Sequence, residues 1–410
     1  MKKKRNLNMF NQIFKREIGL HNPRKLAELK KTERILSLQL SSEKTFQEVP
    51  GDLNTGGVNS LSLSPDLFGR RYLLSATSRG TIAIHDLNTR DGGVCKIIAH
   101  LHPGEPPMHS RNVETVSWYP HDSGLFLSSS VDCSIKVWDT NAMQPVENFT
   151  LQDIIYHHQM SPVATSHSLV AAACRDSRVY LADLQSGSAT HILKGHKKSV
   201  LSLAWSTKDP FILASGSSDN RVLLWDIRNA SGAVLGLDQH NGKQTSEFAK
   251  HKTAHNGHVN AMSFTSNGLH LVTYGTDDRL RLWDVTTGRN CLVNYGRIAN
   301  RCNKGVQIAV SDTSQELAFL PTLSDLLAVD IHSGKHVMKL KGPYRSVNCC
   351  VYEENYQELY SGSNDTFILA WQPQRRVVES LESSSDTDGD LRTKHGPNIY
   401  QDTWSSDEDC

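Results

Sequence analysis

The chain has 410 residues, of which 38% are hydrophobic and 21% charged, and its formal net charge is +1. This composition excludes a fibrous or wholly disordered chain and is typical of a turn-rich globular protein. No uncharged apolar run approaches the ~18 residues of a membrane span, and the N-terminal sequence MKKKRNLNMF lacks the apolar stretch of a signal peptide. We therefore expect an intracellular protein without membrane contact.

The first 34 residues are strongly basic and contain two predicted helices. Apolar residues in the first helix recur at the spacing of one amphipathic face: Phe10, Ile13, Phe14 and Ile18. Asn22-Pro23 interrupts this pattern and can cap a second helix, which carries Leu26 and Leu29. The two helices either pack on the rest of their own chain or are offered to a groove of another protein.

Seven copies of one repeat follow. Each copy ends an alternating apolar run with a Trp-Asp dipeptide or a degenerate form of it: His85-Asp86, Trp138-Asp139, Ala182-Asp183, Trp225-Asp226, Trp283-Asp284, Val329-Asp330 and Trp371-Gln372. Successive copies are 53, 44, 43, 58, 46 and 42 residues apart, close to the roughly 40 to 45 residues of a four-stranded propeller blade. The two long spacings place insertions at residues 87–108 and 228–254. The pattern predicts an all-β fold, a seven-bladed WD-repeat β-propeller.

A short alternating segment, Leu36, Leu38 and Leu40, precedes the first repeat. We expect it to form the outermost strand of blade seven, which would close the ring and cover a sheet edge. The sequence therefore divides into a basic helix-loop-helix over residues 1–34, a propeller over residues 35–375 and a tail over residues 376–410. From Glu379 onward the tail is rich in Ser and acidic residues, and we expect it to be disordered.

Three blades share a set of four residues at nearly equal offsets. The sets, called tetrads below, are His109, Ser128, Asp132 and Trp138 in blade two; His196, Ser215, Asp219 and Trp225 in blade four; and His255, Thr273, Asp277 and Trp283 in blade five. An imidazole, a hydroxyl, a carboxylate and an indole N–H can satisfy one another's hydrogen bonds where water is scarce. We expect these networks to select strand order, while apolar burial supplies most of the stability.

The other blades depart from the tetrad. Blade three keeps Asp176 but has Ala182 in place of Trp, and blades one and six keep almost none of the set. Blade seven keeps Ser361, Asp365 and Trp371. A propeller tolerates such weak blades because each sheet is braced by two neighbours.

The chain contains no recognisable catalytic or cofactor motif. It has no G-x-S-x-G elbow, no G-x-x-x-x-G-K-[ST] phosphate loop and no G-x-G-x-x-G, so we expect neither enzymatic activity nor a cofactor. Histidines cluster in the second insertion (His240, His251, His255 and His258), but no thiol or carboxylate accompanies them at a ligand spacing, and we expect no metal. The eight cysteines form no C-x-x-C pair, so we expect mostly reduced thiols in the core. His157 and His158 are expected in a loop or at a strand end after blade two.

Several stretches outside the tetrads resemble one family of WD-repeat proteins. They are ETVSWYPHDSGLF (114–126), HHQMSP (157–162), LDQHNGK (237–243), TAHNGHVN (253–260), LVNYG (292–296) and QELYSGSND (357–365). From about residue 24 to the terminal WSSDED, the chain resembles the family of the Cockayne syndrome WD-repeat protein CSA. The resemblance implies a nuclear, non-catalytic substrate receptor of a cullin-4 RING ubiquitin ligase that acts in transcription-coupled nucleotide excision repair.

The resemblance also implies partners and a docking site. Receptors of this family dock on the adaptor, damaged-DNA-binding protein 1, through an N-terminal helix-loop-helix and one propeller face. The corresponding segments here are residues 10–18, residues 23–34 and the box Trp225-Asp226-Ile227-Arg228, in which Arg228 either reaches across the interface or makes a local salt bridge. Further implied partners are cullin-4 and its RING subunit, a CSB-type repair ATPase and stalled RNA polymerase II. The opposite face and the two insertions are the expected substrate surface.

The residues themselves leave alternatives open. A WD-repeat scaffold in a chromatin or RNA-processing complex would share the blades but would not need the N-terminal helices. A hydrolase propeller would need inward-facing carboxylates or histidines in the central channel. The basic runs Lys2–Arg5 and Lys30-Lys31 are either solvated or contact nucleic acid, so direct nucleic-acid contact also stays open.

Overall fold

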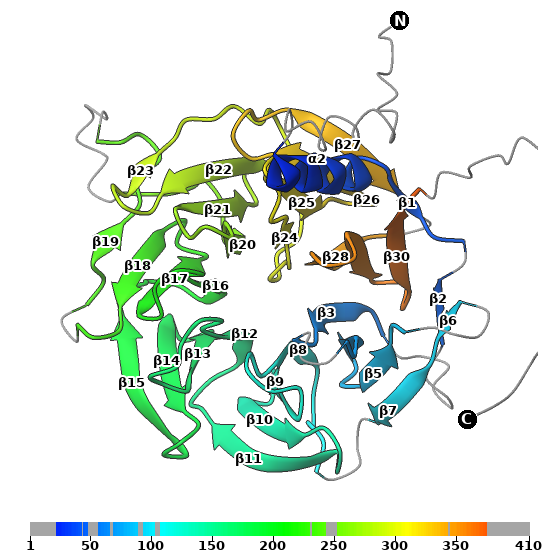
Figure 1. Ribbon diagram of the computed structural model, residues 1–410. Coiled ribbons are helices and arrows are strands. Elements are labelled where there is room, and N and C mark those ends of the chain that lie inside the picture. The colour runs from blue at the N-terminus through cyan, green and yellow to red at the C-terminus, as the bar shows by residue number, and fades with distance from the viewer. Residues whose placement is uncertain are drawn as a thin grey trace, which may run out of the picture. The chain divides into compact units, whose positions relative to one another are not determined.

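The computed structural model describes residues 22–42, 44–47, 56–65, 69–88, 93–102, 107–229, 232–242, 252–342 and 345–374. Within them, seven four-stranded antiparallel sheets are arranged around a central axis (Figure 1). The predicted seven-bladed β-propeller is confirmed. The predicted helix over residues 10–18 and the tail over residues 376–410 lie outside the described residues.

Each blade runs from an innermost strand at the axis to an outermost strand at the rim. Blade one is β3 (Val58–Leu63), β4 (Tyr72–Thr77), β5 (Ile82–Asp86) and β7 (Ile97–Leu101); blade two is β8 (Val113–Trp118), β9 (Leu125–Ser130), β10 (Ser134–Asp139) and β11 (Gln144–Thr150); blade three is β12 (Ile155–Met160), β13 (Leu169–Cys174), β14 (Arg178–Asp183) and β15 (Ser188–Lys194). Blade four is β16 (Val200–Trp205), β17 (Ile212–Ser217), β18 (Val222–Asp226) and β19 (Leu235–Gly236); blade five is β20 (Val259–Phe264), β21 (His270–Gly275), β22 (Arg279–Asp284) and β23 (Arg289–Asn290). Blade six is β24 (Ala309–Val310), β25 (Leu317–Pro321), β26 (Asp325–Asp330) and β27 (His336–Lys341); blade seven is β28 (Val347–Glu353), β29 (Glu358–Ser363), β30 (Ile368–Pro373) and β1 (Leu38–Leu40).

Blade seven is built from both ends of the described chain. Its outermost strand, β1, pairs antiparallel with β30, so that Leu38 lies opposite Pro373 and Leu40 opposite Trp371. The expectation that the segment around Leu38 closes the ring is confirmed. This pairing covers the edge of β30, which would otherwise expose unpaired backbone groups.

A second strap joins blades seven and one. The two-residue strand β2 (Thr45–Phe46) pairs in parallel with β6 (Val94–Cys95), which the first insertion supplies. Phe46 packs edge-on against His85 of blade one and Tyr360 of blade seven, with ring centroids 5.4 and 6.1 Å apart. The strap therefore places an aromatic ring across the junction where the circle closes.

The core lies between the blades. In the described residues, one cluster of buried apolar side chains fills each interface between neighbouring blades. Trp138 of blade two, for example, packs with Leu74 and Ile84 of blade one, and none of the three is more than 2% exposed. The middle strands are covered on both faces, and this explains why their sequences are nearly continuous apolar runs, whereas the rim strand β15 is mostly exposed.

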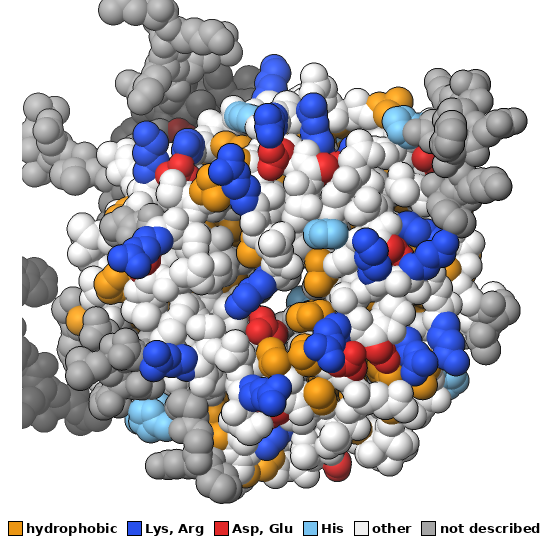
Figure 2. All heavy atoms as spheres, turned by 180° about the vertical axis from the view of Figure 1, so that it is seen from behind, with side chains coloured by type: hydrophobic (Ala, Val, Ile, Leu, Met, Phe, Trp, Pro, Cys, Tyr) orange, Lys and Arg blue, Asp and Glu red, His pale blue; other side chains and the backbone are white. Residues whose placement is uncertain are grey.

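The propeller has two distinct faces. Because successive strands run antiparallel, the first-to-second and third-to-fourth strand turns of every blade lie on one face, which we call the helix face. The second-to-third strand turns and the connections between blades lie on the other, the loop face (Figure 2). The single helix of the described residues, α2 (Pro23–Ile35), lies on the helix face over blades six and seven (Figure 1).

The helix α2 matches the second predicted helix to within one residue. Its C-terminal end is anchored: Ile35 is fully buried between blades six and seven, and Arg34 Nη2 donates to the Tyr356 carbonyl over 3.1 Å. In the described part of the chain, no helix has the length and apolar character that crossing a membrane requires.

Candidate functional site

The structure brings the four side chains of each predicted tetrad together. In blade two, His109 Nε2 lies 2.7 Å from Ser128 Oγ, and His109 Nδ1 lies 3.0 Å from Asp132 Oδ2. The Trp138 indole N–H donates to the same Ser128 hydroxyl over 2.7 Å. The same contacts join His196, Ser215, Asp219 and Trp225 in blade four, and His255, Thr273, Asp277 and Trp283 in blade five.

The tetrad carboxylates are held in their charged form. Burial alone raises the pKa of Asp132, but hydrogen bonds from His109 and Ser134 outweigh it and hold this pKa well below its ordinary value. Burial opposes ionisation of Asp277 in the same way, and its hydrogen bond with His255 again produces a strongly lowered pKa. These groups are therefore committed to the fold and are not free to act as acids or bases.

Two of the degenerate blades keep the hydrogen bond between the second-strand hydroxyl and the ring at the Trp position. In blade seven, the Trp371 indole donates to Ser361 Oγ over 2.8 Å. In blade one, His85 stands at the Trp position, and its Nε2 lies 3.0 Å from Ser75 Oγ. Blade one thus retains a pair that the repeat pattern did not reveal, because an imidazole replaces the indole.

Of the residues expected to contact an adaptor, the structure describes those on α2 and on blade four. Leu29 is 49% exposed on the helix face, and Leu26 is half-buried. Phe10, Ile13, Phe14 and Ile18 lie outside the described residues. Thr32, Arg34 and Ile35 in the last turn of α2 contact the propeller, whereas the side chain of Leu29 is largely open to solvent.

Arg228 lies on the helix face at the turn after β18. Its side chain is 56% exposed and makes a two-point ion pair with Asp226, with Nε–Oδ1 and Nη2–Oδ2 distances of 2.9 and 2.7 Å. The guanidinium also lies over the Phe211 ring, 4.7 Å from its centroid. The local salt bridge considered from the sequence is therefore present, and it fixes the guanidinium fork at the surface.

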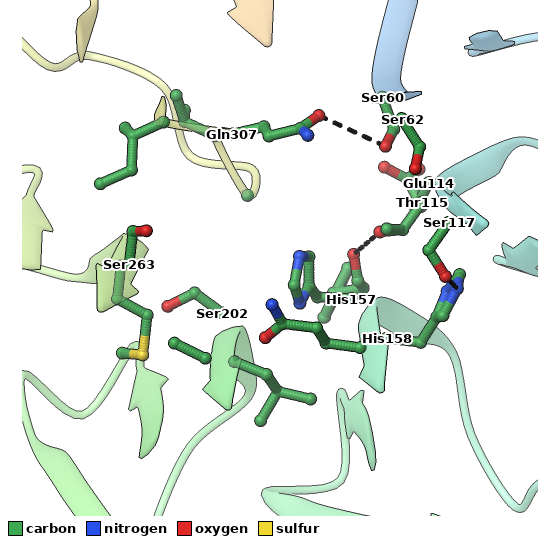
Figure 3. Close-up of a pocket in the computed structure, with 18 of the residues that line it drawn as sticks. Ser60, Ser62, Glu114, Thr115, Ser117, His157, His158, Ser202, Ser263 and Gln307 are labelled. Carbon is green, nitrogen blue, oxygen red and sulfur yellow. Dashed lines mark hydrogen bonds between the residues drawn. The ribbon is translucent and has the colours of Figure 1, made fainter. Parts of the chain in front are cut away.

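The innermost strands enclose a cavity of about 280 Å³ along the axis. Figure 3 shows His157 projecting into it from β12, with Glu114, Ser202 and Gln307 around the same space. The expectation that His157 and His158 lie in a loop or strand end after blade two was wrong, because both belong to the innermost strand of blade three. The channel thus holds a carboxylate, Glu114, and a histidine, His157, of the kinds that a hydrolase would need.

The chemistry of this channel does not resemble that of a hydrolytic site. Among the described residues that line the channel, Ser117 Oγ and His158 Nε2 form a Ser–His pair, 2.9 Å apart. The other nitrogen of His158 lies 2.7 Å from Ser129 Oγ, not from a carboxylate. Burial lowers the pKa of His158 to about 3, so the imidazole is too weak a base to activate a hydroxyl near neutral pH. This histidine instead joins blades two and three.

Gln307 is a second channel residue that the sequence gave no reason to select. Its side chain makes two hydrogen bonds with the backbone of Leu61 in blade one, Leu61 N to Oε1 over 3.0 Å and Nε2 to the Leu61 carbonyl over 2.7 Å. Its own backbone bonds to Asn348 and Cys350 of blade seven. The side chain and backbone of this one residue therefore link three blades, and only the closed ring brings these segments together.

The described residues offer no evident metal site. They contain no group of three or more His, Cys, Asp and Glu side chains placed to hold an ion. His255 is engaged by Thr273 and Asp277, and His258 Nδ1 by the Ser218 carbonyl at 2.9 Å. Cys95, Cys174, Cys349 and Cys350 are buried as free thiols, and burial raises the pKa of each.

Comparison with known proteins agrees with this architecture. The model of the WD domain, G-beta repeat, matches residues 104–139, 187–226 and 244–284, which correspond to the three blades with complete tetrads. The chain is therefore a WD-repeat β-propeller. WD repeat-containing protein ATCSA-1 of Arabidopsis thaliana is 33% identical to it over 91% of this chain and 97% of that protein. The chain belongs to the CSA family of WD-repeat proteins.

Other relatives are more distant. Histone acetyltransferase type B subunit 2 of Debaryomyces hansenii is 26% identical over 62% of this chain and 59% of that protein. The E3 ubiquitin-protein ligase COP1 of Pisum sativum is also 26% identical, over 40% of this chain and 23% of that protein.

Proposed function

We propose that this protein is the substrate-recognition subunit of a cullin-4 RING ubiquitin ligase and acts in the nucleus in transcription-coupled nucleotide excision repair. It presents stalled RNA polymerase II and repair factors such as a CSB-type ATPase to a ubiquitin-charged enzyme carried by other subunits. Its contribution is proximity, which raises the effective concentration of target and enzyme, and it performs no bond-making itself. The observation that carries the proposal is the placement of α2 and Arg228 on one face of a propeller of the CSA family.

The helix face has the features of a docking surface for the adaptor. Apolar side chains on and beside α2 are left open to solvent, with Leu29 49%, Leu36 44% and Tyr356 38% exposed. Exposed large apolar groups that are close together mark sites where proteins associate. Arg228 adds a planar fork that is pre-oriented by Asp226, so little side-chain freedom is lost when it meets a carbonyl or carboxylate.

Binding of the purified chain to damaged-DNA-binding protein 1 tests the proposal. We expect the full chain to be retained by immobilised adaptor and a variant lacking residues 1–34 to be lost. Leu29→Asp and Arg228→Ala should each weaken binding by about tenfold, as buried apolar and Arg anchors commonly do. Leu323→Asp is the matched control, since Leu323 is 45% exposed on the loop face. Failure of the full chain to bind, or full binding by the variant lacking residues 1–34, would contradict the proposal.

A scaffold in a chromatin complex is the second candidate, supported by the similarity to histone acetyltransferase type B subunit 2. In that case the protein would bind histones without the adaptor, and removal of residues 1–34 would leave its assembly unchanged. Co-purification from nuclear extract with the full chain and with the variant lacking residues 1–34 distinguishes the two proposed functions.

A further inference from the structure

The loop face has a strongly biased surface charge. In its described turns and inter-blade connections, every charged side chain that is exposed belongs to Lys or Arg, including Arg111 of the connection into blade two, Lys198 of that into blade four and Arg301 of that into blade six. Figure 2 shows this face, with Lys and Arg side chains distributed around the central opening. The formal charge of the whole chain, +1, conceals this bias.

On the same face, hydrogen bonds within the blades hold the acidic side chains close to the protein interior. Asp132, Asp219 and Asp277 are bonded to tetrad histidines. Others pair with bases that point outward: the side chain of Asp278 is 15% exposed while that of its partner Arg297 is 79% exposed, and Asp365 is 16% exposed against 91% for Arg345. The carboxylates are thus held beneath the surface, and the cationic groups form the layer that a partner meets first.

Several of these cations form no direct ion pair within the described residues. No ion pair within the described residues involves Arg111, Lys198 or Arg301, whereas Arg175 is held by Asp153 at 2.9 Å. Positive charge that is not paired in this way, arranged around the central opening, attracts anionic partners and raises their association rate.

Two large apolar side chains are exposed on the same face. Leu323 in the blade-six turn and Phe367 in the blade-seven turn are 45% and 48% exposed. Their turns flank the start of β28: the Leu323 carbonyl accepts from Val347 N over 3.3 Å, and Asn364 N donates to the Ser346 carbonyl over 3.0 Å. Apolar groups within a polar, charged rim are typical of protein-binding surfaces.

We propose that the loop face binds an acidic polypeptide segment that also carries an apolar anchor. Its carboxylates meet the ring of Lys and Arg, and its anchor packs on Leu323 and Phe367. A nucleic acid would satisfy the cations but would leave the exposed leucine unused, and single-stranded nucleic acid is commonly held on several stacking aromatic side chains along a basic groove. The inference rests on the proposed function only where it takes the bound acidic segment to belong to the protein that is to be ubiquitinated.

Fluorescence anisotropy with the full chain tests this inference. The probe is a short labelled peptide of glutamates with a central Trp-Leu pair. The triple variant Arg111→Glu, Lys198→Glu and Arg301→Glu should weaken binding by about tenfold or more, since three attractive charges become repulsive ones. The matched control Lys208→Glu, Arg289→Glu and Lys335→Glu makes the same change of charge at exposed positions of the helix face and should bind as the unmodified chain does.

The anchor is tested separately with the double variant Leu323→Ser and Phe367→Ser. It should bind the Trp-Leu peptide more weakly but bind a peptide with Ser-Ser at the centre unchanged. Equal losses in the two triple variants would overturn the inference, as would tighter binding of a single-stranded DNA of equal charge, which would indicate a nucleic-acid surface. The loop-face triple variant should still bind the adaptor, so loss of peptide binding with retained adaptor binding leaves the proposed function intact.

Discussion

A tetrad indole in this propeller always has a hydroxyl acceptor ten residues earlier in the chain. Where the hydroxyl is missing, the indole is missing too: blade three has Ala172 and Ala182 at these positions, and blade six has Phe319 and Val329. A buried polar group without a partner costs about 1–3 kcal/mol, whereas replacing both partners by apolar groups can be nearly neutral. The repeat therefore varies by pairs of residues.

This pairing predicts the effect of removing one hydroxyl. Ser215→Ala leaves the Trp225 N–H and His196 Nε2 without their shared partner and should lower the free energy of unfolding by about 1–3 kcal/mol. Adding Trp225→Phe should cost less than the sum of the two single changes, because the indole N–H is then absent. Chemical denaturation of the three variants measures this coupling, and strict additivity would contradict the pairwise account.

His158 predicts a pH dependence of stability. Burial lowers its pKa to about 3 in the folded protein, while an unfolded histidine has a pKa of about 6.5. As pH falls below about 6.5 the unfolded chain binds a proton that the folded chain does not, so stability falls by about 1.4 kcal/mol per pH unit from this group. Denaturation between pH 7 and 5 should show a shallower slope for His158→Gln than for the unmodified protein. The exposed His191→Gln should leave the slope as it is.

At the scale of elements, the three-residue strand β1 is predicted to stabilise the propeller by closing the ring. Deleting residues 1–41 removes the partner of β30 and the buried side chains Ile35 and Leu38. We expect a marked fall in melting temperature and a tendency to self-associate through the exposed edge. Thermal unfolding and size-exclusion chromatography measure both effects. Deleting residues 1–21 is the matched control, because it leaves α2 and β1 in place.

Element order and spacing were accessible from the sequence because each blade repeats one pattern. The Trp-Asp positions all fall at the ends of third strands or one residue before the end, including the degenerate His85-Asp86 and Val329-Asp330. The position of His157 and His158 on β12 was missed, since blade three lacks most tetrad residues and a pair of polar residues in an innermost strand does not follow the apolar pattern. The hydrogen-bond partners of His158, Ser117 and Ser129, belong to blade two and meet it only when blades two and three pack together.

For the molecule as a whole, a buried ion cluster lies between blades seven and one, where the ring closes. Arg71 Nε donates to Glu353 Oε1 over 2.7 Å, its Nη2 lies 2.6 Å from Glu358 Oε2, and Lys44 Nζ lies 2.9 Å from the same oxygen. Although burial opposes ionisation, Lys44, Tyr360 and Arg71 lower the pKa of Glu358 to about 2. Its carboxylate therefore contributes stability that is fully present above about pH 4.3 and is lost as pH falls toward 2.

Breaking this cluster should weaken the whole ring. Arg71→Met leaves two buried carboxylates with one cation and should cost about 3–5 kcal/mol, in line with the removal of one partner from other buried ion pairs. Adding Glu353→Gln to Arg71→Met should recover part of the loss, since it removes one of the uncompensated charges. Thermal denaturation of both variants measures the effect. A loss below about 1 kcal/mol, the size of a surface ion pair, would show that the cluster is not needed for closure.

The sequence by itself determined the number of blades, their order, the closing strand and the three tetrads, because these follow from local spacing that each blade repeats. The tertiary structure alone decided that Gln307 meets Leu61 of blade one and that Arg71 meets Glu353 and Glu358, since these partners are separated by more than 200 residues. It also decided the charge of the loop face. Acidic and basic residues are nearly equal in number along the chain, and only folding turns the turn carboxylates inward onto histidines and backbone N–H groups while leaving the Lys and Arg side chains in water.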